Sequence, residues 1–389
     1  MNDGSLDAKG GCRYDLNRSR IAIVGAGLFG RTLALTLLRK GLAVTLFDKD
    51  SLDGTSSCAF TGAGMLAPYC ELDSSPELIF ELGRDSTKLW AEILNKLPDR
   101  VFLQKEGTIV IAHPSDQLLL TNFHARISNK LQARSDDLVW LDAEQLSVLE
   151  PSLFGRFDNA LFACDEGQID NRELMRALSS ALLDGQCDWK VNTLVQSVEQ
   201  RTISKGAISE LSTSAGKYQF DLVFDCRGMG GKPEFSELRG VRGEMLEVEA
   251  PDVVLTRPLR FLHPRYPIYI VPRPGKRFLI GATSLECEDY RPISVLSTLE
   301  LLSAAYSVDP AFAYASVIDA RVNCRPTLTN NQPLIQHSGG LIQVNGLYRH
   351  GFLLTPKLVR LLIDWLESKP IDATFSDLFK EVKQIAVAN

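Results

Sequence analysis

The sequence lacks several features that define whole classes of protein. None of its apolar runs approaches the roughly 18 residues that a helix needs to cross a bilayer. Residues 1–19 are polar and contain no apolar core, so we expect a flexible N-terminal extension rather than a signal peptide. The net charge of −6 and the pI near 5.5 argue against nucleic acid or an anionic membrane as a main partner. We therefore predict a soluble cytoplasmic protein.

The cysteines and histidines form no pattern typical of a metal site. The eight cysteines include no CxxC pair, and the five histidines are scattered without an HxxxH pair. A chain without a signal peptide is expected in a reducing compartment, where disulfides are rare. The sequence therefore predicts neither a metal centre nor a disulfide framework.

What the chain does contain, close to its start, is an apolar run that breaks into glycines. The run from Arg20 to Val24 stops at Gly25, Gly27 and Gly30 and then resumes at helical spacing, which predicts a strand, a tight turn and a helix. Gly25 permits the turn, Gly27 lets a pyrophosphate approach the backbone, and Gly30 lets helix and strand pack closely. The helix N-terminus offers free N–H groups and a positive dipole end to phosphates.

A carboxylate follows at the spacing that this motif requires. The second apolar run, residues 43–47, ends in Asp48, 18 positions after Gly30. An acid at an offset of about 20 residues can hold a ribose hydroxyl. Together these residues predict a dinucleotide-binding βαβ unit, and the alternative is a glycine-bearing turn without a ligand.

The rest of the chain alternates between helical and strand-like patterns. Helical periodicity predicts one long helix over 76–96 and further helices over 115–130, 142–149, 171–183, 295–306 and 357–367. Strand-like runs occupy 102–112 as a hairpin-type pair, then 160–164, 189–195, 218–226, 243–249, 268–271, 277–283, 316–325 and 341–344. The run 218–226 is almost continuously apolar, as is typical of a buried parallel strand.

This order of elements predicts an α/β fold with a doubly wound, Rossmann-like dinucleotide domain and a second α+β domain built on an antiparallel sheet. We expect the dinucleotide domain to be discontinuous, with residues 20–100, 152–236 and 318–389. Residues 101–151 and 237–317 would form the second, substrate-binding domain.

Four blocks in the same order make the chain similar to the D-amino-acid oxidase and glycine oxidase family of flavoproteins, and glycine oxidase resembles it most. They are the glycine turn with Asp48, where the family usually has Glu; residues 61–66; residues 269–273 with 281–283; and residues 324–326 with 347–356. The resemblance covers most of positions 20–366.

The resemblance implies FAD, with its ADP half on the βαβ unit and its isoalloxazine ring facing the antiparallel domain. The residues implied to bind it are Gly25, Gly27, Leu28, Phe29, Gly30, Asp48, Lys49, Thr61, Gly62, Gly64, Met65, Leu66, Val195, Gly228, Arg325, His350, Gly351, Phe352, Leu353 and Leu354. The last helix, starting near Lys357, would point its positive end at the flavin, or it is an ordinary amphipathic helix.

The same likeness implies three catalytic residues: Arg325 would clamp a substrate carboxylate, Tyr269 would assist it, and Arg349 would lie near substrate and flavin. A guanidinium fork suits the first role because it holds a carboxylate by two parallel hydrogen bonds. The alternatives are an interdomain ion pair for Arg325 and core packing for Tyr269. For Arg227 the alternatives are a second cationic contact in the site and a pairing at the surface.

The implied reaction is oxidation of the Cα–N bond of glycine, sarcosine or a small D-amino acid. Hydride would pass to the flavin, the imine would hydrolyse to an oxo acid and ammonia, and O2 would be reduced to H2O2. Because the cofactor carries this chemistry, no catalytic triad is required. Three alternatives remain: a dehydrogenase with a quinone or protein acceptor, a maturation factor acting on a partner protein, and a non-catalytic FAD-stabilised scaffold. The sequence leaves open whether the chain forms a homo-oligomer or binds a partner protein.

Overall fold

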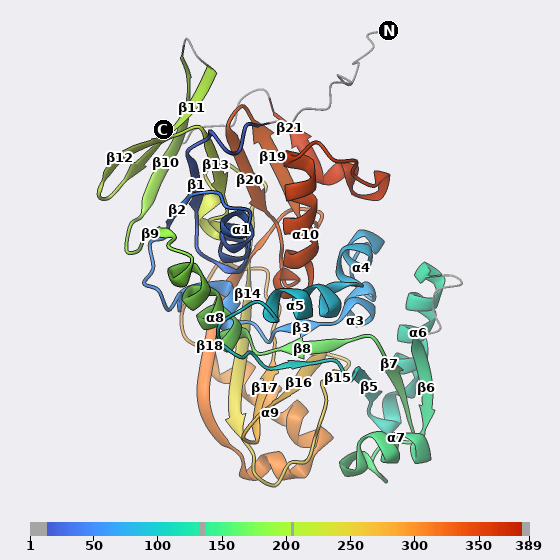
Figure 1. Ribbon diagram of the computed structural model, residues 1–389. Coiled ribbons are helices and arrows are strands. Elements are labelled where there is room, and N and C mark those ends of the chain that lie inside the picture. The colour runs from blue at the N-terminus through green and yellow to red at the C-terminus, as the bar shows by residue number, and fades with distance from the viewer. Residues whose placement is uncertain (1–13, 132–136, 204–205, 383–389) are drawn as a thin grey trace.

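The computed structural model describes residues 14–131, 137–203 and 206–382. Two large sheets dominate it, and they lie in opposite halves of the molecule (Figure 1). The upper half in this view holds a largely parallel sheet with helices on one face and a three-stranded sheet on the other, and the lower half holds a largely antiparallel sheet. The predicted fold class is therefore confirmed.

The upper sheet has seven strands and grows outward from the glycine turn. Its order is β21 (Phe379–Glu381), β19 (Leu334–Ser338), β20 (Leu341–Asn345), β13 (Leu222–Asp225), β1 (Ile21–Val24), β2 (Val44–Phe47) and β9 (Asp188–Lys190). All neighbours pair in parallel except β19 and β20. The predicted strand, turn, helix and strand at its centre are confirmed as β1, α1 (Leu28–Arg39) and β2.

Helix α1 packs against α8 (Asn171–Asp184) and α10 (Gly351–Leu366), which also covers this sheet (Figure 1). Helix α10 contains Pro356, whose nitrogen carries no hydrogen and leaves the carbonyl of Phe352 without its helical donor. The indole Nε1 of the buried Trp90 donates to that carbonyl at 2.7 Å. A side chain from another helix thereby satisfies the gap in the α10 ladder.

The lower sheet has eight strands. Its order is β18 (Ser316–Thr327), β14 (Arg239–Glu249), β17 (Arg277–Gly281), β16 (Ile268–Arg273), β15 (Leu259–Leu262), β5 (Thr108–Ala112), β7 (Asn159–Ala163) and β6 (Leu138–Asp142). Successive side chains along each strand point to opposite faces of this sheet, and a hydrophobic core lies against each face. Ile109 and Ile111 enter the core under α9 (Val295–Val308), whereas Val110 and Ala112 join the core that includes α6 (Gln117–Leu131).

Smaller elements connect and flank these sheets. Strands β10 (Val195–Ile203), β11 (Gly206–Thr213) and β12 (Gly216–Phe220) form one three-stranded sheet, and β3 (Met65–Leu66), β8 (Gly167–Ile169) and β4 (Leu103–Gln104) form another. The remaining helices are α2 (Cys58–Thr61), α3 (Pro68–Leu72), α4 (Glu77–Gly83), α5 (Ser86–Leu94) and α7 (Ala143–Leu149). No helix within the described ranges combines the length and the apolar character needed to span a membrane.

Several predicted elements are wrong in their extent. The strand-like run over 189–195 is divided between β9 and β10, which belong to different sheets. The helix expected over 76–96 is two helices, α4 and α5. The pair expected over 102–112 is not a hairpin, since β4 and β5 belong to different sheets, and the strand expected over 218–226 is divided between β12 and β13 in the same way. The last helix begins at Gly351 instead of Lys357. Pro356 removes one hydrogen bond of this helix, and the Trp90 indole supplies the missing donor to the Phe352 carbonyl.

Candidate active site

A cavity of about 300 Å³ opens at the glycine turn, and we call it the turn cavity. Of the residues that the sequence implies for cofactor binding, it is lined by Gly25, Gly27, Leu28, Phe29, Asp48, Lys49, Gly62, Gly228, Arg325, Gly351 and Phe352. They come from the turn before α1, the end of β2, the loop after α2, the loop after β13, strand β18 and the start of α10. The structure thus brings together residues that lie more than 300 positions apart.

The glycine turn has the geometry that a dinucleotide requires. Gly25 has a φ of +98°, and a Cβ on Gly30 would lie 1.9 Å from the Gly25 carbonyl oxygen, so helix and strand are in backbone contact there. A Cβ on Gly27, by contrast, would meet nothing within 4 Å. No side chain caps the N-terminus of α1, so its N–H groups remain available to a phosphate.

Asp48 fixes the turn from the neighbouring strand. Its Oδ2 accepts a hydrogen bond from the backbone N–H of Ala26, and its Oδ1 accepts one from Asp50 at 2.7 Å. The carboxylate therefore ties the end of β2 to the glycine turn while lining the turn cavity. This is the place where a ribose hydroxyl of a bound dinucleotide would meet it.

Other implied cofactor residues lie away from this cavity. Gly64 and Met65 line a second cavity instead. Gly30, Thr61, Leu66, Val195, His350, Leu353 and Leu354 line neither. Leu66, Leu353 and Leu354 are buried in the hydrophobic core, and any contact between these seven residues and a cofactor stays a prediction.

The second cavity, which we call the sheet cavity, measures about 320 Å³ and lies over the eight-stranded sheet. Its floor includes a row of residues paired across four strands, namely Arg260 on β15, Tyr269 on β16, Gly281 on β17 and Met245 on β14. Gly62, Arg325, Arg349 and Phe352 line both cavities, so the two adjoin.

Arg325 stands at this junction, on β18. Its guanidinium lies over Gly243 of the adjacent strand β14, where a Cβ would come within 2.3 Å of Nη2. Nη1 donates to the carbonyl oxygens of Thr283, at 3.1 Å, and of Arg242, at 3.4 Å. Among the described residues Arg325 forms no ion pair, so an interdomain ion pair is not its role here. Burial lowers the pKa of its guanidinium.

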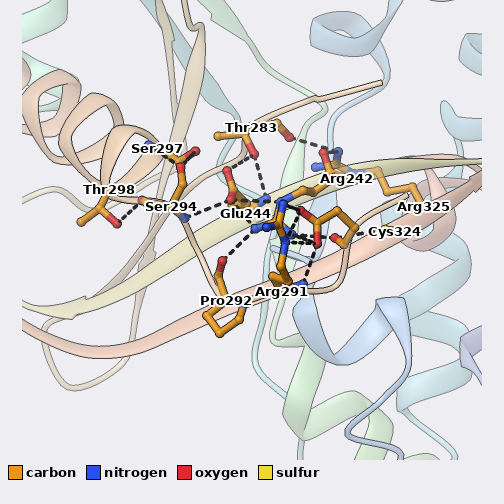
Figure 2. Close-up of polar contacts among 11 residues, drawn as sticks. Arg242, Glu244, Thr283, Arg291, Pro292, Ser294, Ser297, Thr298, Cys324 and Arg325 are labelled. Atoms are coloured by element: carbon orange, nitrogen blue, oxygen red, sulfur yellow. Dashed lines mark hydrogen bonds and ion pairs between the residues drawn. The ribbon is translucent and has the colours of Figure 1, made fainter. Parts of the chain in front are cut away.

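A buried ion pair between Arg242 and Glu244 fixes the two carbonyl groups that accept hydrogen bonds from Arg325 (Figure 2). Arg242 donates from Nη2 to Glu244 Oε1 at 2.7 Å and to the Pro292 carbonyl at 2.9 Å. Glu244 Oε2 in turn accepts from the hydroxyl of Thr283 at 3.0 Å. The strand carrying Arg242 and the loop carrying Thr283 are therefore fixed by the same carboxylate.

The motif-based analysis missed a central residue of the sheet cavity, Glu71. This carboxylate lies on α3, is 7% exposed, and accepts hydrogen bonds from Arg349 Nε at 2.5 Å and from the Tyr269 hydroxyl at 3.0 Å. Nδ1 of the buried His350 lies 3.3 Å from it. The available signal was a single acid between apolar residues after Pro68, which no motif distinguishes.

These contacts determine the charge of the cluster. Burial alone would raise the pKa of Glu71, but the Arg349 guanidinium and then His350 hold it well below its usual range. Burial, followed by the Glu71 carboxylate, raises the pKa of Tyr269 well above its usual value. Burial lowers the pKa of His350. The cluster therefore contains an ionised Glu71 and Arg349, with a protonated phenol on Tyr269.

Arg227 differs from both sequence-based alternatives. It lines the turn cavity, but its guanidinium is paired with Asp225 at 2.7 Å and with Glu234 at 2.8 Å. Its side chain is only 10% exposed, so the pairing is buried rather than superficial. Among its described contacts, its donors on Nε and Nη2 are engaged by these carboxylates.

The two adjoining cavities define a class of protein: a Rossmann-type dinucleotide enzyme whose cofactor reaches from a glycine turn to a separate substrate sheet. The bare helix N-terminus, the placed carboxylate of Asp48 and the lining residues that the two cavities share fit FAD. The family model described as FAD dependent oxidoreductase matches residues 20–365, so the chain belongs to that family and is an FAD-dependent oxidoreductase.

Individual relatives agree with this assignment. The chain is 40% identical, over 339 residues, to a protein named as a thiamine biosynthesis oxidoreductase, ThiO, in Rhizobium etli; the match covers 87% of this chain and 94% of the relative. It is 28% identical to a glycine oxidase of Geobacillus kaustophilus, covering 92% and 94% of the two chains. A crystal structure of glycine oxidase from the same organism has a TM-score of 0.80 at 24% identity, covering 93% and 98%.

Proposed function

We propose that the protein oxidises the Cα–N bond of a small amino acid, namely glycine, sarcosine or a small D-amino acid, and passes the electrons to O2. The observation that carries this proposal is that Arg325, at the junction of the two cavities, has guanidinium donors without acceptors among the described residues. Only Nη1 of its guanidinium has acceptors among the described residues, and both are carbonyl oxygens. The edge formed by Nε and Nη2 is a fork suited to a carboxylate.

The other residues of the sheet cavity suit an amine held beside that carboxylate. The Tyr269 hydroxyl donates a hydrogen bond to Glu71, so the lone pairs of its oxygen are left to accept a hydrogen bond from a substrate N–H. Arg349 neutralises Glu71, which prevents the carboxylate from competing with the substrate for Arg325. FAD, when bound, supplies the hydride acceptor and the route by which electrons reach O2.

Two further observations support an amino acid as the substrate. The relatives named as glycine oxidases use a substrate with one amine and one carboxylate, which Tyr269 and Arg325 could each hold. A carboxylate held by two parallel hydrogen bonds also fixes the orientation of Cα, and such orientation accounts for much of the catalytic effect in hydride transfer. Water hydrolyses the resulting imine to an oxo acid and ammonia, or to an oxo acid and methylamine where the substrate is sarcosine.

The test is anaerobic mixing of the purified, FAD-loaded protein with glycine, sarcosine and D-alanine while the flavin absorbance is recorded. We expect bleaching by at least one of them and release of H2O2 when air is admitted. Bleaching without peroxide would identify a dehydrogenase with another acceptor. No bleaching by any small amino acid would overturn the proposal and favour a partner protein as the substrate.

Arg325→Ala tests the observation that carries the proposal. We expect this variant to keep FAD and to lose saturation with the amino acid, because the fork for the carboxylate is gone. The matched control is Arg176→Ala, which removes an exposed arginine on α8 that lines neither cavity. An unchanged KM in Arg325→Ala would remove Arg325 from the site.

A further inference from the structure

A second arginine faces the sheet cavity, at the opposite side of its floor from Arg325. Arg260 on β15 pairs in register with Tyr269, so both side chains stand on the same face of the sheet. The guanidinium carbon of Arg260 lies 4.5 Å from the centre of the Tyr269 ring. Arg260 lines the cavity although it is only 9% exposed.

Arg260 makes no direct ion-pair contact with a carboxylate, although its charge contributes to lowering the pKa of Glu71. Its Nε is buried and makes no hydrogen bond, and across the described part of the chain its guanidinium forms no ion pair. Glu71 is committed to Arg349 and Tyr269, and Glu300, which also lines the cavity, makes no ion pair with Arg260. Burial without an ion-pair contact disfavours a cation, and the ring of Tyr269 offsets only part of that cost.

Arg325 and Arg260, neither of which forms an ion pair in the described part of the chain, are separated by a distance that a small ligand can span; Arg265, which also lines the cavity, is exposed. Arg325 lies over Gly243 on β14 and Arg260 lies over Tyr269 on β16. These positions are two strand spacings apart across the sheet and two residues out of register along it, or about 12 Å apart. With a hydrogen bond of about 2.8 Å at each end, a molecule with two carboxylates a few bonds apart fills the remainder. Glycine, with one carboxylate, leaves Arg260 without a partner.

We propose that Arg260 is a second carboxylate subsite and that the preferred substrates are amines carrying two carboxylates, such as aminodicarboxylic acids or N-carboxymethyl amino acids. This inference rests on the proposed oxidation of an amino acid in the same cavity. Arg325 would hold the carboxylate beside the oxidised Cα–N bond, and Arg260 would hold the distal one. Arg260 is thus a specificity-determining residue.

A binding experiment tests the subsite without any turnover. Succinate and butyrate have the same chain length and differ by one carboxylate, and neither carries an amine. We expect calorimetric titration of the FAD-loaded protein to give a Kd for succinate at least tenfold below that for butyrate. In Arg260→Gln the ratio of the butyrate Kd to the succinate Kd should fall to near one. In the charge-matched control Arg176→Gln this ratio should remain at the wild-type value.

A kinetic experiment tests the same residue with substrates. Iminodiacetate is sarcosine with a carboxylate added to its methyl group, so the pair isolates the distal charge. We expect kcat/KM for iminodiacetate to exceed that for sarcosine in the wild type, and Arg260→Gln to lower the ratio of the two kcat/KM values at least tenfold. Arg260→Lys, which keeps the charge, should retain part of the preference.

The two experiments separate the possible failures. Equal affinity for succinate and butyrate in the wild type, or an unchanged ratio in Arg260→Gln, overturns the subsite. A protein that binds succinate selectively but is bleached by none of the amines retains the subsite and overturns the proposed oxidation. If Arg260→Gln fails to hold FAD, the wild-type ratio and the Arg260→Lys variant decide the matter.

Discussion

The guanidinium of Arg325 occupies the space that a side chain on Gly243 would take. A Cβ there would lie 2.3 Å from Nη2 and 2.4 Å from Cζ. The absence of a side chain on one strand therefore sets the position of a charge on its neighbour.

We expect Gly243→Ala to displace this guanidinium and to raise the KM for a carboxylate substrate at least tenfold, because the bidentate hydrogen bonds depend on its placement. FAD content and the thermal midpoint should change little. The matched control is Gly275→Ala, at a turn between β16 and β17 where a Cβ would meet nothing within 4 Å. Because Gly275 has a φ of +78°, its variant loses stability but should keep the KM. An unchanged KM in Gly243→Ala would contradict the prediction.

The glycine turn allows a matched pair of alanine variants. In Gly30→Ala the new methyl group would collide with the backbone of Gly25, so the thermal midpoint of the FAD-free protein should fall. In Gly27→Ala the methyl group meets no protein atom, so that midpoint should stay, while the Kd for FAD rises at least tenfold because the methyl group occupies the turn cavity. Fluorescence titration with FAD and thermal melts measure both. Equal FAD affinity in wild type and Gly27→Ala would show that the cofactor does not approach this turn.

Trp90→Phe should destabilise the fold by about 1–3 kcal/mol, because the carbonyl of Phe352 then has no donor in a buried place. Trp189→Phe is the control, since its buried indole N–H has no hydrogen-bond partner to lose. Chemical denaturation compares the two variants. A cost for Trp189→Phe as large as that for Trp90→Phe would mean that lost ring volume, not the hydrogen bond, determines the effect.

Glu166 gives a prediction about pH. It is fully buried and accepts from the backbone N–H of Cys70 at 2.7 Å, and burial raises its pKa to about 7. An unfolded glutamate has a pKa of about 4.3, so between these values the folded chain binds the extra proton. The contribution of Glu166 to the free energy of unfolding therefore falls as pH rises from about 4.3 to 7, by at most about 1.4 kcal/mol per pH unit.

Glu166→Gln should flatten this part of the stability curve and raise the thermal midpoint at pH 8, because glutamine keeps the acceptor for Cys70 without a charge. Glu92→Gln, at an exposed position, should keep the wild-type slope. Melts between pH 5 and 8 make the comparison. A parallel slope in wild type and Glu166→Gln would assign the dependence to another group.

The sequence predicted those parts of the fold and site that depend on local pattern. The glycine turn and Asp48 belong to a motif in which each position has a steric or polar requirement, and they do line one cavity. Strand ends were harder: β12 and β13 are separated by Asp221 alone, so one apolar run feeds two sheets. What distinguishes the two strands is their pairing: β12 pairs with β11, whereas β13 pairs with β1 and β20, which are distant in sequence.

Glu71 and Arg260 could not be found in this way. Each is a single charged residue in an apolar segment, and its role depends on what the fold places beside it: Tyr269 and Arg349 for the first, and no ion-pair contact for the second. The sequence pattern of one segment does not show which side chains the fold places beside a residue, or that it places none. Arg260, Tyr269, Arg325 and Arg349, which all line the sheet cavity, come from β15, β16, β18 and the loop before α10.

The contacts of Glu71 also bear on how the molecule comes apart. Its carboxylate, on α3, joins Tyr269 of the eight-stranded sheet to Arg349 in the loop that leads into α10, which covers the seven-stranded sheet. Separating the two halves would break both bonds and expose a carboxylate and a guanidinium that are paired in the native state. The sheet cavity and the junction between the sheets should therefore open in a single cooperative step, with hydrogen exchange in α3, β16 and the start of α10 occurring at a common rate.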